Sequence, residues 1–463
     1  MKYCNRPFEH CYVLPDGRVR ICGWTDGTIG NLIEQDLDEI WKGEKAEIQR
    51  DAIRNGSFEF CRKTSCPFLE NDNLPDLDEE EFNKKAVALE SPIDFSVACD
   101  YVCNHSCPSC REKVFVGDSK YTENVNIMID KLLPYLGKAD YVLTDGNGDA
   151  FASPSIMRMM QQIRFARKES RFGIETNGVL FDEEHWEKIK HLGEHNLTVT
   201  VTPNSFVPST YKYLNGGHNT YDKMIHNLYF IKSLREQGLV NEYNISIVVQ
   251  DRNFMEVPEF AKRSIEDFGA DQVVIKPLYH WFGLSEDLYW QKDILNPMHP
   301  YHKEYMEVLK HPYLKNEKVF FWGADNLHPA VPHPAYKYKE QLDMVIKCVE
   351  DEKISEKVRK YLKVNNINSI YVYGDEQLSA FIYNLLRDVI NVKGFIARDI
   401  CRKEICGMPV INICDYKPVA EDNIIVINYK YIDIIRKDLE MTGFKGKLIE
   451  MDKFIDSVLK LDN

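Results

Sequence analysis

The middle of the chain alternates short runs of β-branched and aromatic residues with longer segments whose apolar residues recur at helical spacing. Amphipathic segments such as NVNIMIDKLLPYLG and YDKMIHNLYFIKSLREQG predict helices. Six of the short runs predict strands, and these begin near Ile93, Asp140, Phe172, Leu197, Asn244 and Gln272. Strands that alternate with helices form parallel βαβ units. Because a closed barrel has eight such units, the pattern predicts an open, partial (β/α)6 TIM-like barrel over residues 88–335.

Two segments of different composition divide the chain into three blocks. NDNLPDLDEEEFNKK at 71–85 is acidic and rich in turn residues, and DNLHPAVPHPAYKYK at 325–339 is rich in proline, so both predict linkers. The first block covers residues 1–75. The last block, 355–463, repeats the alternation of strands and helices on a smaller scale, which is typical of a Rossmann-like α/β domain.

The last block has a poor nucleotide-binding signal. Its turn YGDEQLSA keeps only Gly374 where a dinucleotide fingerprint has three glycines. The sequence therefore leaves open whether this domain binds a cofactor, orients a substrate or is structural.

Composition and charge narrow the function classes. The 463 residues are 44% apolar and 28% charged, with a net charge of −14 and no concentration of Lys and Arg, which argues against a nucleic-acid partner. The N-terminal residues MKYCNRPFEH lack the apolar core of a signal peptide, and no later run is long enough to cross a membrane. We therefore expect a cytoplasmic protein, whose 13 cysteines are more often metal-binding or catalytic than paired in disulfides.

Four cysteines lie within the segment CDYVCNHSCPSC, directly after the first predicted strand of the barrel. Cys103, Cys107 and Cys110 form a C-x3-C-x2-C motif. Three thiolates from one loop can hold three irons of a [4Fe–4S] cluster and leave the fourth iron open. Cys99 is in phase with the apolar residues of the strand, so we expect it to be a core thiol. A zinc knuckle or another redox turn is the alternative.

This motif, on the first strand of a partial barrel, resembles the radical S-adenosylmethionine (radical SAM) enzymes. The resemblance implies that SAM chelates the open iron and is cleaved reductively to methionine and a 5′-deoxyadenosyl radical, which removes hydrogen from a substrate. The family usually has an aromatic residue before the third cysteine, where this chain has Ser109. That departure affects one adenine contact and leaves iron ligation untouched.

The resemblance also implies cofactor contacts at the ends of the following strands. TDGNGDAFASP, after the second strand, is similar to the glycine-rich motif of the family, with Asn147, Gly148 and Asp149 at the positions of Gly-Gly-Glu. The polar residues that end the third, fourth and fifth strands would face the same pocket: Asn177, Thr202, Asn204 and Gln250. Each of these could instead be a helix cap or a turn residue.

The first block resembles a SPASM or shorter twitch domain. It has a hairpin, YVLPDGRVRIC, turning at Asp16 and Gly17, a helix expected from about Leu37, and a closing cysteine pair. The resemblance implies an auxiliary [4Fe–4S] cluster on Cys4, Cys22, Cys61 and Cys66. Cys11 is left over, either as a spare thiol or as a replacement for Cys4. Four cysteines that include a C-x4-C pair could equally hold zinc.

The expected activity is that of a radical SAM enzyme with oxidoreductase-like chemistry, since an auxiliary cluster beside the radical site can accept an electron. The last block resembles Rossmann modules of carbohydrate-modifying proteins, which favours a sugar or other small molecule as substrate. SPASM domains are also frequent in enzymes that modify ribosomal peptides, so a peptide is the alternative. A flavodoxin or ferredoxin is the expected electron donor. The alternative from another functional class is a non-catalytic iron–sulfur or zinc protein that carries electrons or serves as a scaffold.

The segment HWFGLSEDLYW places Trp281 and Tyr289 where they could line the barrel mouth or pack onto the linker.

Overall fold

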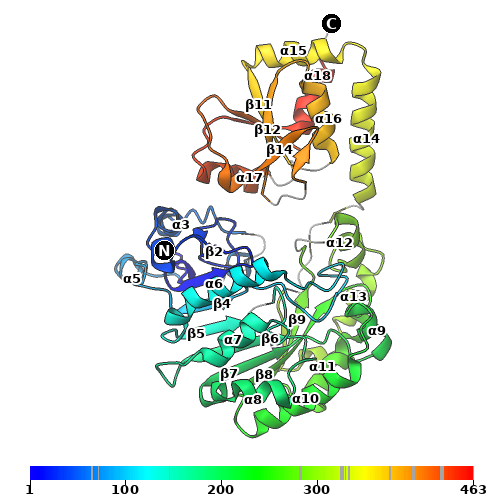
Figure 1. Ribbon diagram of the computed structural model, residues 1–463. Helices are drawn as coiled ribbons and strands as arrows, with labels where there is room; N and C mark the ends of the chain where they lie inside the picture. Colours follow the sequence, from blue (N-terminus) through cyan, green and yellow to red (C-terminus); the bar gives the residue numbers. More distant parts are fainter. Residues whose placement is uncertain are drawn as a thin grey trace. The chain divides into compact units, whose positions relative to one another are not determined.

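The computed structural model divides the chain into two compact units, Met1–Pro334 and Ala335–Asn463 (Figure 1). It describes residues 1–63, 66–70, 72–144, 146–280, 284–323, 328, 330–331, 334–374, 377–398, 402–427 and 432–461. Trp281 lies outside these described residues.

The first unit is built on parallel strands, each followed by one or more helices. All six strands predicted for the middle of the chain are present: β4 (Asp94–Val97), β5 (Tyr141–Thr144), β6 (Arg171–Thr176), β7 (Asn196–Val201), β8 (Glu242–Val249) and β9 (Gln272–Pro277). The intervening helices are α6 (Ser119–Leu136), α7 (Pro154–Gln162), α8 (Glu183–Ile189), α9 (Pro208–Leu214), α10 (Tyr221–Glu236), α11 (Val257–Glu266), α12 (Glu286–Lys292) and α13 (His302–Val308). The six strands pair in chain order, as in an open, partial TIM-like barrel (Figure 1).

The strands of the first block extend this same sheet. β1 (His10–Val13) pairs in parallel with β4, and β2 (Arg18–Arg20) and β3 (Gly30–Asn31) follow in antiparallel pairing. On the opposite edge, β10 (Val319–Phe321) pairs in parallel with β9. The result is one ten-stranded sheet in the order β10-β9-β8-β7-β6-β5-β4-β1-β2-β3. Because β1 covers the edge of β4, the first block and the barrel share one sheet and one large core cluster, and the first block has a second, smaller apolar cluster of its own.

The first block also contains short helices, and one of them occupies a segment expected to be a linker. Its helices are α1 (Arg6–Glu9), α2 (Leu37–Trp41), α3 (Glu44–Arg54), α4 (Pro67–Glu70) and α5 (Glu79–Lys85). α2 begins at the predicted Leu37. The acidic segment is not a plain linker, because Asp78 caps α5 and Phe82 buries its ring against Tyr3. The proline-rich segment likewise includes the start of α14 (Pro334–Glu350).

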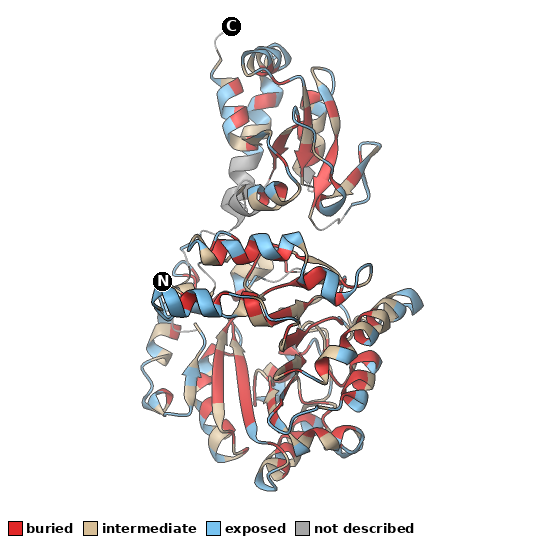
Figure 2. Ribbon diagram, turned by 90° about the vertical axis from the view of Figure 1, so that its left-hand side faces the viewer, coloured by how far each residue is buried: buried red, intermediate tan, exposed pale blue. Residues whose placement is uncertain are grey.

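Strand residues alternate between two environments. Apolar side chains such as Phe172, Val199 and Ile245 pack with the surrounding helices in the core, and buried residues are concentrated along the strands (Figure 2). The residues between them, such as Thr200 and Ser246, face the inner side of the curved sheet, which we call the lumen. The barrel therefore has an apolar outer layer and a polar lumen.

The second unit has its own six-stranded sheet, in the order β13-β14-β12-β11-β15-β16. Its strands are β11 (Ser369–Tyr373), β12 (Asn391–Ala397), β13 (Glu404–Ile405), β14 (Met408–Asn412), β15 (Asn423–Val426) and β16 (Lys447–Glu450). Its further helices are α15 (Ile354–Val364), α16 (Gln377–Leu386), α17 (Ile432–Met441) and α18 (Met451–Leu459). Separate apolar clusters cover the two faces of the sheet, as is usual for parallel strands.

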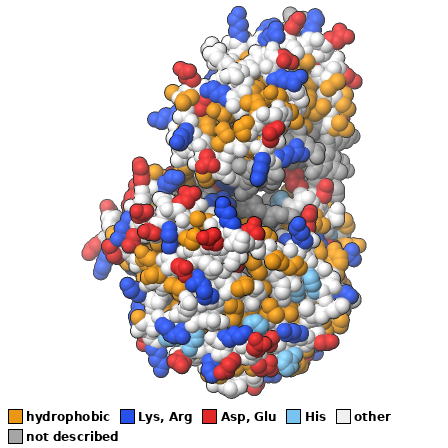
Figure 3. Space-filling view, viewed as in Figure 1, with side chains coloured by type: hydrophobic (Ala, Val, Ile, Leu, Met, Phe, Trp, Pro, Cys, Tyr) orange, Lys and Arg blue, Asp and Glu red, His pale blue; other side chains and the backbone are white. Residues whose placement is uncertain are grey.

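Charged side chains of both signs lie interspersed over the face drawn in Figure 3. Among the described residues, no helix is both long enough and apolar enough to cross a membrane.

A buried aspartate in the second unit makes a testable contribution to stability. Asp422 is 1% exposed and accepts hydrogen bonds from Lys393 Nζ (2.6 Å), Tyr416 Oη (2.7 Å) and the Val419 amide (3.0 Å). Burial alone would raise the pKa of Asp422, but these hydrogen bonds outweigh it and hold the pKa below its usual value. Asp422→Asn is expected to lower the free energy of unfolding of this unit by about 1–3 kcal/mol at neutral pH, measured by urea titration.

The contribution of Asp422 to the free energy of unfolding should change with pH in one direction. Since the folded pKa is depressed, the stabilisation is complete above the unfolded pKa and is lost as the pH falls through the folded value. The deficit of Asp422→Asn should therefore shrink in acid. Asp388→Asn, at an exposed aspartate of the same unit, is the control. Equal stability of the two variants at neutral pH would contradict the assignment.

Candidate functional site

The cysteine motif lies in the loop at the carboxyl end of β4. Cys103, Cys107 and Cys110 are each partly exposed, whereas Cys99 is fully buried in the core, as its phase on the strand predicted. The amides of Cys110 and Arg111 both donate to the Cys107 carbonyl, at 2.8 and 2.9 Å. This turn directs the end of the loop back toward its start.

The three thiols of the motif lie close enough to interact electrostatically. The pKa of Cys107 is raised to about 12, first by burial and then by Cys103 and Cys110. The pKa of Cys103 is raised to about 11, first by burial and then by Asp149, with a smaller contribution from Cys110. Three neighbouring thiols are a donor set that fits an iron–sulfur cluster, because iron compensates the thiolate charge. Within the described ranges, no group of three or more His, Cys, Asp or Glu side chains is arranged to hold a single metal ion.

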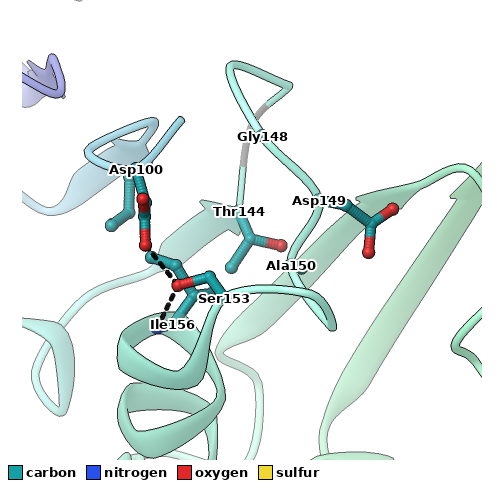
Figure 4. Close-up of a pocket in the computed structure, with 8 residues that line it drawn as sticks. Asp100, Thr144, Gly148, Asp149, Ala150, Ser153 and Ile156 are labelled. Atoms are coloured by element: carbon teal, nitrogen blue, oxygen red, sulfur yellow. Dashed lines mark hydrogen bonds between the residues drawn. The ribbon is translucent and has the colours of Figure 1, made fainter. Parts of the chain in front are cut away.

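Asp100 anchors the start of the cysteine loop. Its carboxylate accepts hydrogen bonds from the Val102 amide (3.0 Å), from Tyr121 Oη of α6 (2.9 Å) and from Ser153 Oγ. Ser153 is also the N-cap of α7 and accepts from the Ile156 amide at 3.0 Å (Figure 4). The space beneath these side chains is about 10 Å³, roughly enough for one water molecule. Asp100 therefore joins the loop to two helices, and no feature of its sequence context predicted this.

The glycine-rich loop packs directly on the cysteine loop. A Cβ atom at Gly148 would lie 2.4 Å from the Val102 carbonyl oxygen and 2.7 Å from that of Asp100, distances that no side chain tolerates. Asn147 Nδ2 donates to the Ala98 carbonyl at 3.0 Å, and the Asp149 amide donates to Val102 at 2.9 Å. Asn147, Gly148 and Asp149 thus lie against the backbone that carries the motif.

The Asp149 carboxylate is bound within the protein. It is 3% exposed and accepts hydrogen bonds from Thr176 Oγ1 and the Asn177 amide, both at 2.8 Å. Burial raises its pKa, and these hydrogen bonds offset the effect only in part. In Figure 4 its side chain points away from Asp100 and Ser153. Asp149 therefore links the glycine-rich loop to the end of β6.

Of the other strand-end residues, Asn177 contacts the cysteine motif, whereas Asn204 and Thr202 contact the neighbouring strand β8. Asn177 donates to Asn104 Oδ1 at 2.7 Å and approaches Cys103 Sγ at 4.0 Å, so it reaches the motif. Asn204, with φ at 64°, accepts from the Val248 amide at 2.9 Å through its side chain and so ties the end of β7 to β8. Thr202 Oγ1 lies 2.6 Å from Ser246 Oγ on the lumen side.

Gln250 carries the least satisfied polar group among the expected site residues. It is 1% exposed, and neither the oxygen nor the nitrogen of its side-chain amide has a hydrogen-bond partner in the structure. A buried amide without partners costs free energy. Its position at the end of β8 therefore fits a residue whose partner is a bound cofactor or substrate.

Arg111 is a site residue that the sequence analysis missed. Its guanidinium donates to the Tyr101 carbonyl, to the Asn147 carbonyl and, at 3.4 Å, to Cys110 Sγ. Burial would lower its pKa, but the Cys110 and Cys103 thiolates outweigh burial and raise it. The signal available in the sequence was a basic residue directly after the third cysteine.

The loop between α9 and α10 also packs against the cysteine loop. A Cβ atom at Gly216 would lie 2.3 Å from the Ser106 carbonyl oxygen, so this position between α9 and α10 requires glycine. Ser106 Oγ lies 3.2 Å from His218 Nε2, and His105 stacks on the His218 ring at 5.5 Å. The pKa of His105 is lowered to about 4, first by burial and then by His218.

Three of the four cysteines expected to serve the first block are electrostatically coupled. The pKa of Cys4 is raised to about 12 by burial, then by Cys22, with a smaller contribution from Cys66. Burial also raises the pKa of Cys22, and Cys66 adds to it. Cys61 packs with Cys4 against one apolar cluster. Cys11, by contrast, is fully buried on β1 beside Phe95 in the main core.

Comparison with protein families now identifies the class. Residues 101–263 match the radical SAM superfamily, and residues 4–67 match SPASM, an iron–sulfur cluster-binding domain. The chain thus contains a radical SAM domain that is preceded by a SPASM domain, as the two sets of cysteines predicted. Its cofactors are accordingly a [4Fe–4S] cluster and SAM, as the cysteine motif predicted.

Comparison with individual proteins gives only a weak structural similarity. A solved structure, that of Streptococcus suis SuiB bound to S-adenosylmethionine, is similar at 12% identity with a TM-score of 0.32. The similarity covers 65% of this chain and 66% of that chain, just under two thirds of its length. At this level the likeness carries no information about substrate. No curated protein matches the chain.

The contact between the two loops gives a matched pair of variants. Gly148→Ala would push a methyl group into the Val102 and Asp100 carbonyls, whereas Gly146→Ala would meet only Glu175 Oε2 at 3.5 Å, an ordinary contact. We expect Gly148→Ala to displace the cysteine loop, at a cost of about 1–3 kcal/mol, and to lower the iron bound per chain after anaerobic reconstitution. Gly146→Ala should match the wild type. Equal iron in the two variants would contradict the packing argument.

Proposed function

We propose that Cys103, Cys107 and Cys110 ligate the radical SAM [4Fe–4S] cluster. The observation that carries this proposal is that one loop at the carboxyl end of β4 bears all three partly exposed cysteines, and that Gly148 packs against the backbone of this loop. Catalytic groups in barrels of parallel strands lie at this end, where the loops meet.

The chain's own residues would hold and orient the cofactors. When bound, the reduced cluster and SAM supply a 5′-deoxyadenosyl radical that removes a hydrogen atom from the substrate. We assign SAM contacts to Asn147, Gly148, Asn177, Thr202 and Gln250. The Gln250 amide supports this assignment because its polar atoms have no partner within the protein. Asp149 and Asn204 contribute by fixing the strand ends that carry Asn177 and Gln250.

We propose that Cys4, Cys22, Cys61 and Cys66 hold an auxiliary [4Fe–4S] cluster. The SPASM match over residues 4–67 and the coupling of Cys4 with Cys22 and Cys66 support this set. Such a cluster would accept the electron that remains on the substrate after hydrogen abstraction, while a proton leaves to solvent. The net reaction is then a two-electron oxidation of the substrate. Zinc at this site is the alternative, and metal analysis distinguishes the two.

We propose a sugar or similar small polar molecule as the substrate, with a ribosomal peptide as the alternative. The strand order of the second unit supports a Rossmann-like module, because β11 is central and the chain continues first to one side and later to the other. The net charge of −14 disfavours nucleic acid as a partner. A flavodoxin or ferredoxin in the cytoplasm would supply the electron.

Cysteine variants test the proposal. The wild type, reconstituted anaerobically with iron and sulfide, should hold about eight irons, four for each cluster. Cys103→Ala should lose about four of them and all formation of 5′-deoxyadenosine from SAM with dithionite. Cys61→Ala should lose the other cluster and substrate turnover but keep SAM cleavage. Cys406→Ser, at an exposed cysteine of the second unit, is the control.

Three other outcomes of these experiments would change the assignment of the cofactors. SAM cleavage by Cys103→Ala would refute the ligand assignment. About four irons with one zinc in the wild type would make the first block a structural metal site. Tightly bound iron without SAM cleavage would indicate an electron carrier.

The hydrogen bond from Arg111 to Cys110 Sγ predicts that Arg111 affects the reduction potential of the radical SAM cluster. A cation that donates a hydrogen bond to a ligand sulfur stabilises the more negative, reduced state. Arg111→Met should therefore shift the midpoint potential of the SAM-responsive EPR signal to a more negative value. Arg158→Met removes an equal charge at the α6–α7 contact with Asp130 and should leave the potential unchanged. The same potential in both variants would contradict the role of Arg111.

A further inference from the structure

The lumen contains a continuous row of polar side chains below the proposed cofactor residues. Strand pairing places Glu175 of β6 beside Thr200 of β7, Thr200 beside Asn244 of β8, and Asn244 beside Gln272 of β9. Ile174 before Glu175, and the residues on both sides of Thr200 and Asn244, pack in the apolar core, so these side chains face the lumen. We call the four residues the polar row.

One buried polar atom of this row, Asn244 Oδ1, has no hydrogen-bond partner in the structure. Asn244 is 6% exposed, and its Oδ1 is buried without a partner, although its Nδ2 donates to Glu242 at 2.8 Å. A buried carbonyl of this kind is costly unless a ligand supplies a donor. The row is therefore better explained as a binding surface than as packing.

An ion pair joins the first residue of the row to β9. Lys276 Nζ of β9 lies 3.4 Å from Glu175 Oε1 of β6, and their side chains are 26% and 28% exposed. These two are the charged lumen-facing residues in the carboxyl-terminal halves of β4–β9, strands that the structure describes in full. Because the two charges compensate, the lumen at the carboxyl-terminal halves of these strands offers hydrogen bonds without a net charge, while the Glu242 carboxylate lies near the amino-terminal end of β8 and accepts from Asn244. This part of the lumen suits a neutral group rich in hydroxyls better than a phosphate or a carboxylate.

Aromatic side chains border the same surface on β10. Phe320 pairs with Val274, and the Trp322 amide donates to the Ile275 carbonyl at 2.8 Å, which places Trp322 beside Lys276. Phe320 and Trp322 are 45% and 39% exposed, and their rings contact each other edge to face at 6.2 Å. Val319 and Phe321, which alternate with them, pack against the core. Exposing two large aromatic rings on a strand edge to water is unfavourable in free energy unless a ligand or another surface covers them.

We propose that the polar row, the Glu175–Lys276 pair and the β10 rings together form the substrate site and bind a neutral pyranose ring. The hydroxyls would bond to the polar row and the ion pair, and the apolar face of the sugar would pack on Trp322 and Phe320. This inference rests on the proposed function, because the ring must lie within reach of the radical formed at the strand ends. A peptide substrate would instead require backbone partners in an extended groove, for which the polar row is too localised.

Saturation-transfer NMR on the full-length, reconstituted protein tests this site. The probes are methyl α- and β-D-glucopyranoside, N-acetyl-D-glucosamine and D-glucuronate, with a capped alanine tripeptide for comparison. We expect transfer to the neutral pyranoses and none to the tripeptide. Trp322→Ala should weaken the Kd about tenfold, equivalent to about 1.4 kcal/mol. Lys276→Met should weaken it in the same direction, and Trp322→Phe should retain most of the binding.

Matched controls separate a local effect from misfolding. Tyr229→Ala removes an exposed ring on α10, and Lys188→Met removes a paired lysine on α8, and neither should change binding. Saturation of the tripeptide but of no pyranose would overturn the inference, as would pyranose binding that Trp322→Ala and Lys276→Met leave unchanged. Formation of 5′-deoxyadenosine in the same wild-type sample keeps this test independent. If it forms without pyranose binding, only the substrate inference fails, and if it does not form, the proposed function fails.

Discussion

The parallel pairing of β1 with β4 is the constraint on which the first unit depends. Cys22 follows β2, which runs antiparallel to β1, so it lies near the amino end of β4, whereas the C-x3-C-x2-C loop leaves the carboxyl end of β4. A buried polar contact fixes the register, because His10 pairs with Asp94 in the ladder and its Nδ1 lies 3.1 Å from the Asp94 carboxylate. The barrel and the SPASM domain thus share one core, and a shift in this pairing would expose alternate strand residues.

The environment of the cysteine loop follows from close backbone packing rather than from side-chain bonds alone. Gly148 and Gly216 both pack against the loop, and each meets a carbonyl oxygen at a distance that excludes a Cβ atom. Asp100 and Arg111 then fix its two ends, one through a carboxylate and one through a guanidinium. A loop held in this way presents its thiols without rearrangement, which favours rapid and specific cluster binding.

The lumen shows how the alternation of a strand separates stability from function. On β7, Val199 and Val201 pack outward into the core, while Thr200 and Thr202 face inward. The apolar set stabilises the barrel against its helices, so the inward set is free to vary with the ligand. In the proposed function the polar row and the β10 rings contact the substrate, whereas the cysteine loop holds the cluster.

The sequence by itself predicted six strands and the partial barrel, because strand periodicity is a local property of the chain, and the class of chemistry was implied by the resemblance that the cysteine motif carries. It also predicted that Cys99 lies in the core. It could not predict that β1 joins β4, that a capped helix occupies the acidic segment, or that Asp149 and Asn204 turn their side chains to neighbouring strands. It likewise gave no sign of Asp100 or the polar row. These features arise from contacts between residues far apart in the chain, and only the register and close approach of the folded strands decide which of them meet.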